Sequence, residues 1–208
     1  MKDNLSYLLS TLEFAANVDA GNKSLDNCEY EILKQQPKWQ KYLEQQADLL
    51  QKAIHIFKHY DKSDTLKYFW QTLKAKDIQF TERVFNQLIQ FAVQAYEEGT
   101  LDDAYKMFSF ISTYYPKHYK TYLYLGSIIQ SLKGPDEAAA FFTTTTSIFN
   151  EPDLLFLAAE NEIQRDNVSG AKNYLQKAAK LLEKHNNLDA YETGLKARIE
   201  DLLKDFDS

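Results

Sequence analysis

The feature that most constrains this chain is a small residue followed four positions later by a large apolar one, repeated at intervals of 34 and 33 residues. The three pairs are Ala104 with Phe108, Ala138 with Phe142, and Ala171 with Leu175. Twelve positions before each alanine lies a further small residue, and these are Ala92, Gly126 and Ala159. Two antiparallel helices need small side chains where their axes cross, and a large side chain one turn later fills the gap. The spacing therefore predicts helix pairs that recur along the chain.

The composition and the turn residues agree with repeated helix pairs. The chain of 208 residues holds only 6 glycines and 4 prolines, too few for the many tight turns of a β-sandwich or barrel. The expected turns within the pairs carry Gly99, Gly134 and Asp166 with Asn167. Because one pair cannot bury its apolar face alone, the units are expected to stack around a shared core. The pattern is that of the tetratricopeptide repeat, which predicts an all-α superhelix of three helix pairs.

Two regions are predicted along the chain. Residues 1–73 form an N-terminal helical region for dimerisation or partner binding, with one long helix over 39–57. Residues 74–208 form the tetratricopeptide-repeat domain, which ends in a capping helix over 188–206. Its repeats are predicted near 82–116, 118–150 and 152–185, with helices at 82–98, 101–114, 118–133, 135–149, 153–165 and 168–185.

Charge and cysteine content exclude several classes of protein. The formal net charge is −6, so neither a nucleic acid nor an anionic membrane surface is an expected partner. The one cysteine, Cys28, cannot form an intrachain disulfide, which favours a reducing compartment. No apolar run reaches the length of a membrane span, and Asp3 cancels Lys2 where a signal peptide needs a basic start. We expect a cytoplasmic protein.

The sequence offers little for catalysis. His55 and His59 have the spacing of metal ligands on a helix, but no third ligand accompanies them, so they are interpreted as surface residues. Cys28 lies beside Glu29, which does not favour a reactive thiolate. No phosphate-binding loop, dinucleotide fingerprint or nucleophile elbow is present. The chain is therefore predicted not to be an enzyme, with no catalytic residue, no metal and no cofactor.

A binding groove is predicted from the repeat register. In a superhelix of helix pairs, the first helix of each pair lines the concave face, and its inward residues are both apolar and polar. This mixture suits an extended peptide with hydrophobic anchors. The predicted groove residues are Ile89, Val93, Tyr96, Lys120, Leu123, Ser127, Gln130, Phe156, Glu160 and Ile163.

Three features allow more than one interpretation. Ile89 and Val93 stand where repeat domains that bind the acidic C-terminus of heat-shock proteins place polar clamp residues, which argues against that activity. The threonine run 143–146 is either a polar ligand surface or a set of small side chains for close packing, and we favour packing. The tyrosines near the first repeat junction fit a partly solvent-exposed binding surface and a core equally well. They are Tyr114, Tyr115, Tyr119, Tyr122 and Tyr124.

Residues 74–185 resemble the class II chaperones of bacterial type III secretion systems, which serve the pore-forming translocator proteins. The resemblance rests on 95–104 (AYEEGTLDDA), 122–126 (YLYLG), 130–132 (QSL), 150–152 (NEP), 158–160 (AAE) and the connector 73–78 (LKAKDI). It covers somewhat more than half of the chain, and the order of three repeats is more specific than any one of them.

The resemblance implies a cytoplasmic chaperone that is not an enzyme and that holds an extended segment of a translocator in its groove. It also implies a possible homodimer through the N-terminal helices and, in some members, an interaction with the gatekeeper protein that orders secretion. Residues 1–73 are longer than the usual N-terminal arm. The alternative function is a repeat scaffold that binds a folded gatekeeper or regulator without chaperoning it.

Overall fold

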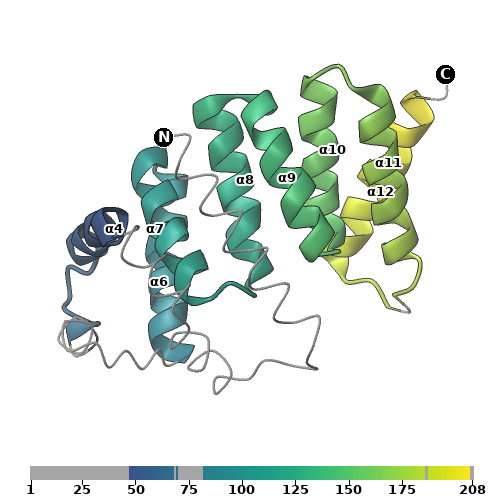
Figure 1. Ribbon diagram of the computed structural model, residues 1–208. Coiled ribbons are helices and arrows are strands. Elements are labelled where there is room, and N and C mark those ends of the chain that lie inside the picture. The colour runs from purple at the N-terminus through teal and green to yellow at the C-terminus, as the bar shows by residue number, and fades with distance from the viewer. Residues whose placement is uncertain (1–46, 68, 70–81, 186, 207–208) are drawn as a thin grey trace, which may run out of the picture. The chain divides into compact units, whose positions relative to one another are not determined.

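Every regular element that the structure describes is an α-helix, which confirms the all-α prediction for these residues. The computed structural model describes residues 47–67, 69, 82–185 and 187–206, and Figure 1 shows the helices in chain order. Described residues up to Thr121 form one compact unit, and those from Tyr122 onward form a second. Among the described helices, none is both long enough and apolar enough to cross a bilayer.

The first unit contains α4 (Ala47–Tyr60), α6 (Glu82–Glu97) and α7 (Leu101–Tyr114). Helices α6 and α7 pack as a pair, and α4 packs mainly against α7. The ring of Phe57 on α4 is fully buried, and its centroid lies 5.4 Å from that of Phe110 on α7. At the end of α4, the Tyr60 hydroxyl donates a hydrogen bond of 3.1 Å to Glu98. Helix α4, from the predicted N-terminal region, is thus attached to the first repeat.

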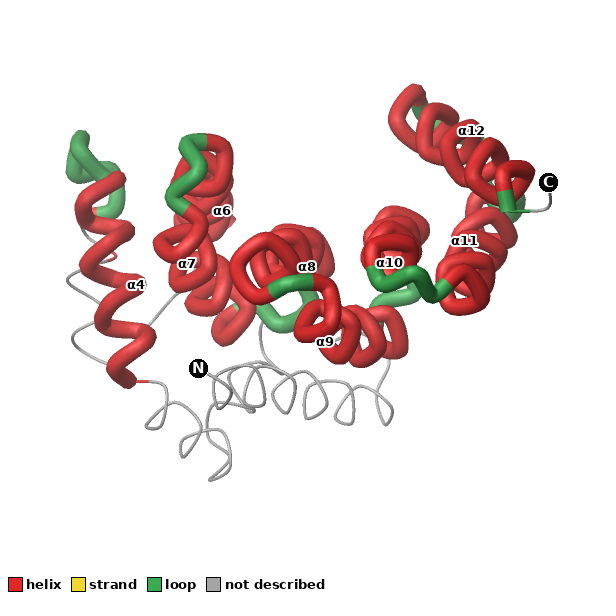
Figure 2. The backbone as a smooth tube through the Cα atoms, turned by 90° about the horizontal axis from the view of Figure 1, so that it is seen from above, coloured by secondary structure: helices red, strands yellow, loops and turns green. Residues whose placement is uncertain are grey.

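The second unit contains most of α8 (Tyr119–Lys133), then α9 (Pro135–Ile148), α10 (Pro152–Gln164), α11 (Val168–Leu182) and α12 (Ala190–Asp205). Helix α10 packs against both α9 and α11, and α12 packs against α11; Figure 2 shows α10, α11 and α12 in sequence. The core between α10, α11 and α12 includes Leu155, Leu175 and Leu195. Helix α12 therefore covers the last helix pair, as a capping helix must.

The small residues of the repeat pattern lie where helices approach most closely. A side-chain Cβ added at Gly126 of α8 would stand 2.5 Å from the ring of Phe142 on α9. Only glycine fits this contact without a shift of the ring. The other members of the pattern are all buried, namely Ala92, Ala104, Phe108, Ala138, Phe142, Ala159, Ala171 and Leu175.

Each turn within a helix pair contains one residue with a positive φ angle. Gly99 and Gly134 have positive φ angles of 77° and 96°, and Asp166 has 57°. Aspartate tolerates this left-handed region better than most residues, because its short polar side chain bonds locally. The third turn therefore has a positive φ without glycine, whereas Gly134, with a ψ of 170°, lies outside the left-handed helical region. Asn167 then caps α11 by accepting a hydrogen bond of 3.1 Å from the Gly170 amide.

The threonine run of α9 bonds to its own helix. The hydroxyls of Thr143, Thr144, Thr145 and Thr146 donate to carbonyl oxygens four residues earlier, at 2.8, 3.1, 2.9 and 2.7 Å. Thr145 is also fully buried. Because these donors are already used within the helix, packing accounts for the run better than a ligand does.

Several predictions fall on residues outside the described ranges. They concern the first part of the helix predicted over 39–57, most of the connector before α6, and Cys28. The described part of that helix continues to Tyr60, three residues further than predicted. The helix predicted over 168–185 ends at Leu182, and the capping helix begins at Ala190 rather than 188.

Candidate protein-binding site

Nine of the ten predicted groove residues occupy three equivalent positions of the repeat, and Lys120 is the tenth. Ile89, Leu123 and Phe156 are related by the repeat spacing, as are Val93, Ser127 and Glu160, and likewise Tyr96, Gln130 and Ile163. Four of the ten predicted residues lie in the first unit, namely Ile89, Val93, Tyr96 and Lys120, and the other six lie in the second.

In the first unit, the predicted residues form one edge of α6. Ile89, Val93 and Tyr96 follow one another at helical spacing and are half-buried. The core face of the same helix carries Leu88 and Ala92, which are fully buried. The edge is therefore apolar and partly accessible, as a site for hydrophobic anchors requires.

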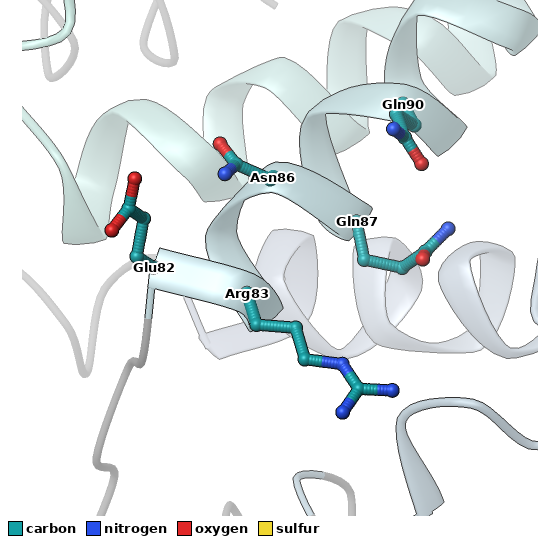
Figure 3. A pocket seen from close by; sticks show the side chains of 5 residues that line it. All are labelled: Glu82, Arg83, Asn86, Gln87 and Gln90. Carbon is teal, nitrogen blue, oxygen red and sulfur yellow. The ribbon is translucent and has the colours of Figure 1, made fainter.

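A shallow polar hollow of about 410 Å³ lies next to this edge, on the exposed face of α6. Figure 3 shows the five side chains that line it. Four carry groups that can donate hydrogen bonds, and the fifth is a carboxylate. The lining residues are Glu82, Arg83, Asn86, Gln87 and Gln90. Sequence reasoning did not select these residues, although the amides recur at helical spacing on α6.

An aromatic cluster joins the start of α6 to the start of α8 within the first unit. The ring of Phe85 lies 4.1 Å from that of Tyr115 and 4.8 Å from that of His118, centroid to centroid. The His118 Nδ1 atom lies 2.9 Å from the Thr121 hydroxyl. Burial, followed by the nearby charge of Lys120, lowers the pKa of His118. The imidazole is therefore held neutral beside the exposed Lys120 side chain.

The tyrosines that crowd this junction do not behave as one group. Tyr114 and Tyr122 belong to the core, with exposed fractions of 8% and 1%. Tyr115, Tyr119 and Tyr124 are half-buried. Both interpretations of the cluster therefore apply, each to different members.

In the second unit, α8 presents a mixed face. Leu123, Ser127 and Gln130 are half-buried and recur at helical spacing, whereas Leu125 and Ile129 point into the core. Leu132 is on a different side of the same helix and is 41% exposed. Helix α8 therefore offers one leucine on the predicted face and one away from it.

Phe156 on α10 is also a predicted groove residue, but it belongs to the core between α10, α11 and α12 and is only 4% exposed. The Arg198 guanidinium of α12 lies 4.7 Å from the centroid of its ring. Arg198 also donates a hydrogen bond of 3.1 Å to Glu160. Burial raises the pKa of Glu160, and the charge of Arg198 partly offsets this rise. Ile163 is half-buried at the next equivalent position.

Arg198 is a residue of the site that sequence reasoning missed. The repeat pattern does not extend into α12, so the pattern assigned this helix only a capping role. In the structure α12 also reaches the predicted face of α10.

The described residues show no arrangement typical of a metal centre. His55 and His59 are both exposed on α4. Within residues 47–67, 69, 82–185 and 187–206, no three His, Cys, Asp or Glu side chains come together as a metal site requires. The apolar and polar side chains on the faces of α6, α8 and α10 can bind another chain.

Comparison with known proteins shows that the fold of the chain is a known one. No protein-family model matches the sequence, and no curated protein matches it. Among solved structures, the chain is similar to PcrH from Pseudomonas aeruginosa, with 25% identity over 62% of this chain and 96% of PcrH, and a TM-score of 0.55. PcrH in complex with the chaperone binding region of PopD matches at 26% identity, over 62% of this chain and 94% of PcrH, with a TM-score of 0.53.

The translocator chaperone SycD of Yersinia enterocolitica has the same fold. It is 23% identical over 60% of this chain and 91% of SycD, with a TM-score of 0.54. The chain is thus similar in structure to type III secretion translocator chaperones with a tetratricopeptide-like fold, and these neighbours are not enzymes.

Proposed function

We propose that this chain, whose fold is that of the translocator chaperones, binds an extended segment of a translocator protein and keeps that protein soluble and competent for secretion. The observation that carries the proposal is the similarity to PcrH, whose structure holds the chaperone binding region of a partner. The proposed contact residues are the half-buried or exposed members of the predicted set: Ile89, Val93, Tyr96, Lys120, Leu123, Ser127, Gln130, Glu160 and Ile163.

The chemistry of these faces supports a holding role. Apolar side chains on α6 and α8 can take hydrophobic anchors of a segment, and the polar neighbours can bond its main chain. A mixed face limits the affinity, so that the cargo can be released for export. The net charge of −6 favours solubility while apolar cargo is shielded in the cytoplasm.

The proposal is tested first by purification from the native cytosol with mass spectrometry of co-purifying chains. Recovery of a large protein with apolar membrane-inserting segments supports the chaperone function and identifies the cargo. Mixing that cargo with the chain should then lower its aggregation, measured as turbidity. Recovery of only a folded gatekeeper or regulator would favour the alternative, a scaffold.

A matched pair of variants locates the segment. Leu123→Glu places a charge on the proposed face of α8 and should weaken peptide binding at least about thirtyfold, since an apolar contact is replaced by a desolvated charge. Leu132→Glu makes the same change on another side of the helix and should leave the affinity unchanged. Equal affinities for both variants, with helicity unchanged by circular dichroism, would exclude this face as the site.

We also propose a homodimer through the N-terminal helices of residues 1–73. Sedimentation of the full chain, and of a variant that lacks only residues 1–46 and so keeps α4 packed on α7, measures it. A dimer that persists in the shorter variant would place the contact outside residues 1–46.

A further inference from the structure

One arginine differs from the other two in its partners. The arginines of the chain are at 83, 165 and 198. Arg165 pairs with Asp136, and Arg198 pairs with Glu160. Arg83, in the first turn of α6, is exposed and forms no ion pair with any residue that the structure describes. Its guanidinium, with five N–H donors, is therefore available to a partner.

Arg83 belongs to a stripe of polar side chains on α6. Gln87, Gln90 and Gln94 follow it at intervals of four, three and four residues, so the four side chains lie on one face of the helix. Gln94 donates a hydrogen bond of 2.7 Å to the Glu98 carboxylate. Gln87 and Gln90 make no side-chain hydrogen bond to any other described residue. The guanidinium and these two amides are thus the unused donors of the stripe.

The unused donors line the shallow hollow of about 410 Å³ on α6. Figure 3 shows the side chains of Arg83 and Gln87 extending to one side of the helix, whereas those of Glu82 and Asn86 extend to another. Glu82 is the carboxylate of the lining, and it does not pair with Arg83. The hollow therefore presents donors that a carboxylate from another molecule can reach.

The first turns of α6 are held in place by aromatic contacts. The Phe85 ring lies 4.1 Å from that of Tyr115 and 4.8 Å from that of His118, centroid to centroid. The backbone that carries the donors is thus packed against the start of α8 before any partner binds. Binding then does not spend free energy on ordering this part of the helix.

The hollow continues the predicted groove. Asn86 of its lining lies 34 residues before Lys120, so the repeat register gives the two residues the same place on their helices. The half-buried Ile89 lies six residues after Arg83, a rise of about 9 Å along the helix. An extended segment advances about 3.3 Å per residue. A side chain that reaches Arg83 therefore stands about three residues from one that contacts Ile89.

A carboxylate is the group that these donors fit. A guanidinium binds a carboxylate through two parallel, charge-assisted hydrogen bonds, which are stronger than bonds between neutral groups. The bond from Gln94 to Glu98 shows that an amide of the same stripe already donates to a carboxylate. A cationic side chain would be repelled by Arg83. An apolar one would cover the donors without bonding them, which costs free energy.

We propose that Arg83, Gln87 and Gln90 bind the side-chain carboxylate of an aspartate or glutamate in the extended partner segment, about three residues from the apolar side chain that contacts Ile89. Arg83 supplies the opposite charge, and the two amides donate to the remaining lone pairs of the carboxylate. This inference rests on the proposed function and adds a charge preference to it.

The test uses the full chain and labelled synthetic peptides from the chaperone binding region of PopD. Every peptide has an amidated C-terminus, so that only a side chain can supply the carboxylate. Each is made in three versions, in which one position is glutamate, glutamine or lysine, and that position is moved along the peptide. At one position glutamate should bind about fivefold to tenfold more tightly than glutamine, and lysine more weakly than both. Added salt should reduce the preference.

Variants then assign the preference to α6. Arg83→Gln should remove most of the difference between glutamate and glutamine, and Arg83→Glu should reverse the preference, so that lysine binds most tightly. Gln87→Ala should weaken the glutamate version by a smaller factor, about twofold to threefold. Lys180→Gln removes the same charge from an exposed residue of α11 and should leave the preference unchanged.

The possible failures are distinct. If peptides bind but no position prefers glutamate, or if Arg83→Gln and Lys180→Gln change the preference equally, this inference is overturned and the proposed function stands. If no version binds the unaltered chain, the proposed function fails and the inference fails with it.

Discussion

Helices α4 and α12 each flank a helix pair, but they are attached to it in different ways. Helix α4 packs mainly on α7, the second helix of its pair, through the buried Phe57. Helix α12 packs on α11 and also extends Arg198 across Phe156 and Glu160 of α10. A flanking helix can thus pack on the core alone, or it can pack on the core and also contact residues of a predicted binding face. Substitutions in the two helices separate these two roles.

The largest effect is expected at Phe57. The variant Phe57→Ala empties a fully buried site and should lower the free energy of unfolding by about 3–5 kcal/mol, from lost burial and the cavity left against α7. Urea denaturation measures the change. His55→Ala, exposed on the same helix, should cost less than about 0.5 kcal/mol. A loss below about 1 kcal/mol at Phe57 would mean that α4 does not unfold together with the first repeat.

A smaller loss is expected at Arg198. The variant Arg198→Ala removes a cation–π contact and an ion pair that are both partly exposed, so the cost should be about 1 kcal/mol. The loss should be greater at neutral than at acidic pH, because burial already raises the pKa of Glu160 and the unpaired carboxylate is disfavoured only when charged.

Lys204→Ala is the matched control on α12, since its pair with Asp201 is exposed on both sides. Urea denaturation of both variants at two pH values should show a loss only for Arg198→Ala. Equal losses at both pH values would show that Arg198 acts through packing on Phe156 rather than through Glu160.

Two titratable side chains, His118 in the first unit and Glu160 in the second, are expected to change stability with pH in opposite directions. Burial lowers the pKa of His118 below its ordinary value near 6.5, so the unfolded first unit binds the proton more readily, and stability is lost as the pH falls through that window. Burial raises the pKa of Glu160 above 4.5, so its contribution to stability falls as the pH rises through its own window. Urea denaturation of His118→Gln at several pH values should show a smaller loss of unfolding free energy as the pH falls. A loss equal to that of the unaltered chain would contradict the assignment to His118.

The repeat spacing predicted much of this fold because each of its small residues has a packing reason. Gly126 must be small against Phe142, and Asp166 takes a positive φ at the position that Gly99 holds in the first turn. The predicted register also placed Leu123 on the accessible side of α8.

The contacts between α10 and α12 were not predictable in the same way. A repeat register assigns faces only to helices that carry the repeat, and α12 carries none of its small–large pairs. Nothing in the sequence relates Arg198 to Phe156, which are 42 positions apart, so burial of the Phe156 ring depends on tertiary packing alone. The extension of the first unit by α4 is likewise a tertiary contact, between Phe57 and Phe110.

The smallest expected effect is at Gly194, and Gly126 of the same unit provides the comparison. Gly194→Ala should raise the free energy of unfolding by about 0.5–1 kcal/mol, since alanine favours the helix and the added Cβ meets no neighbour. Gly126→Ala should lower it by about 1–3 kcal/mol, because the ring of Phe142 must move. Urea denaturation of both variants measures the difference. A gain at Gly194 would mean that the chain retains a destabilising residue on its exposed face, as expected where close approach of a partner matters more than stability. A lower free energy of unfolding for Gly194→Ala would instead show that the glycine stabilises α12 itself.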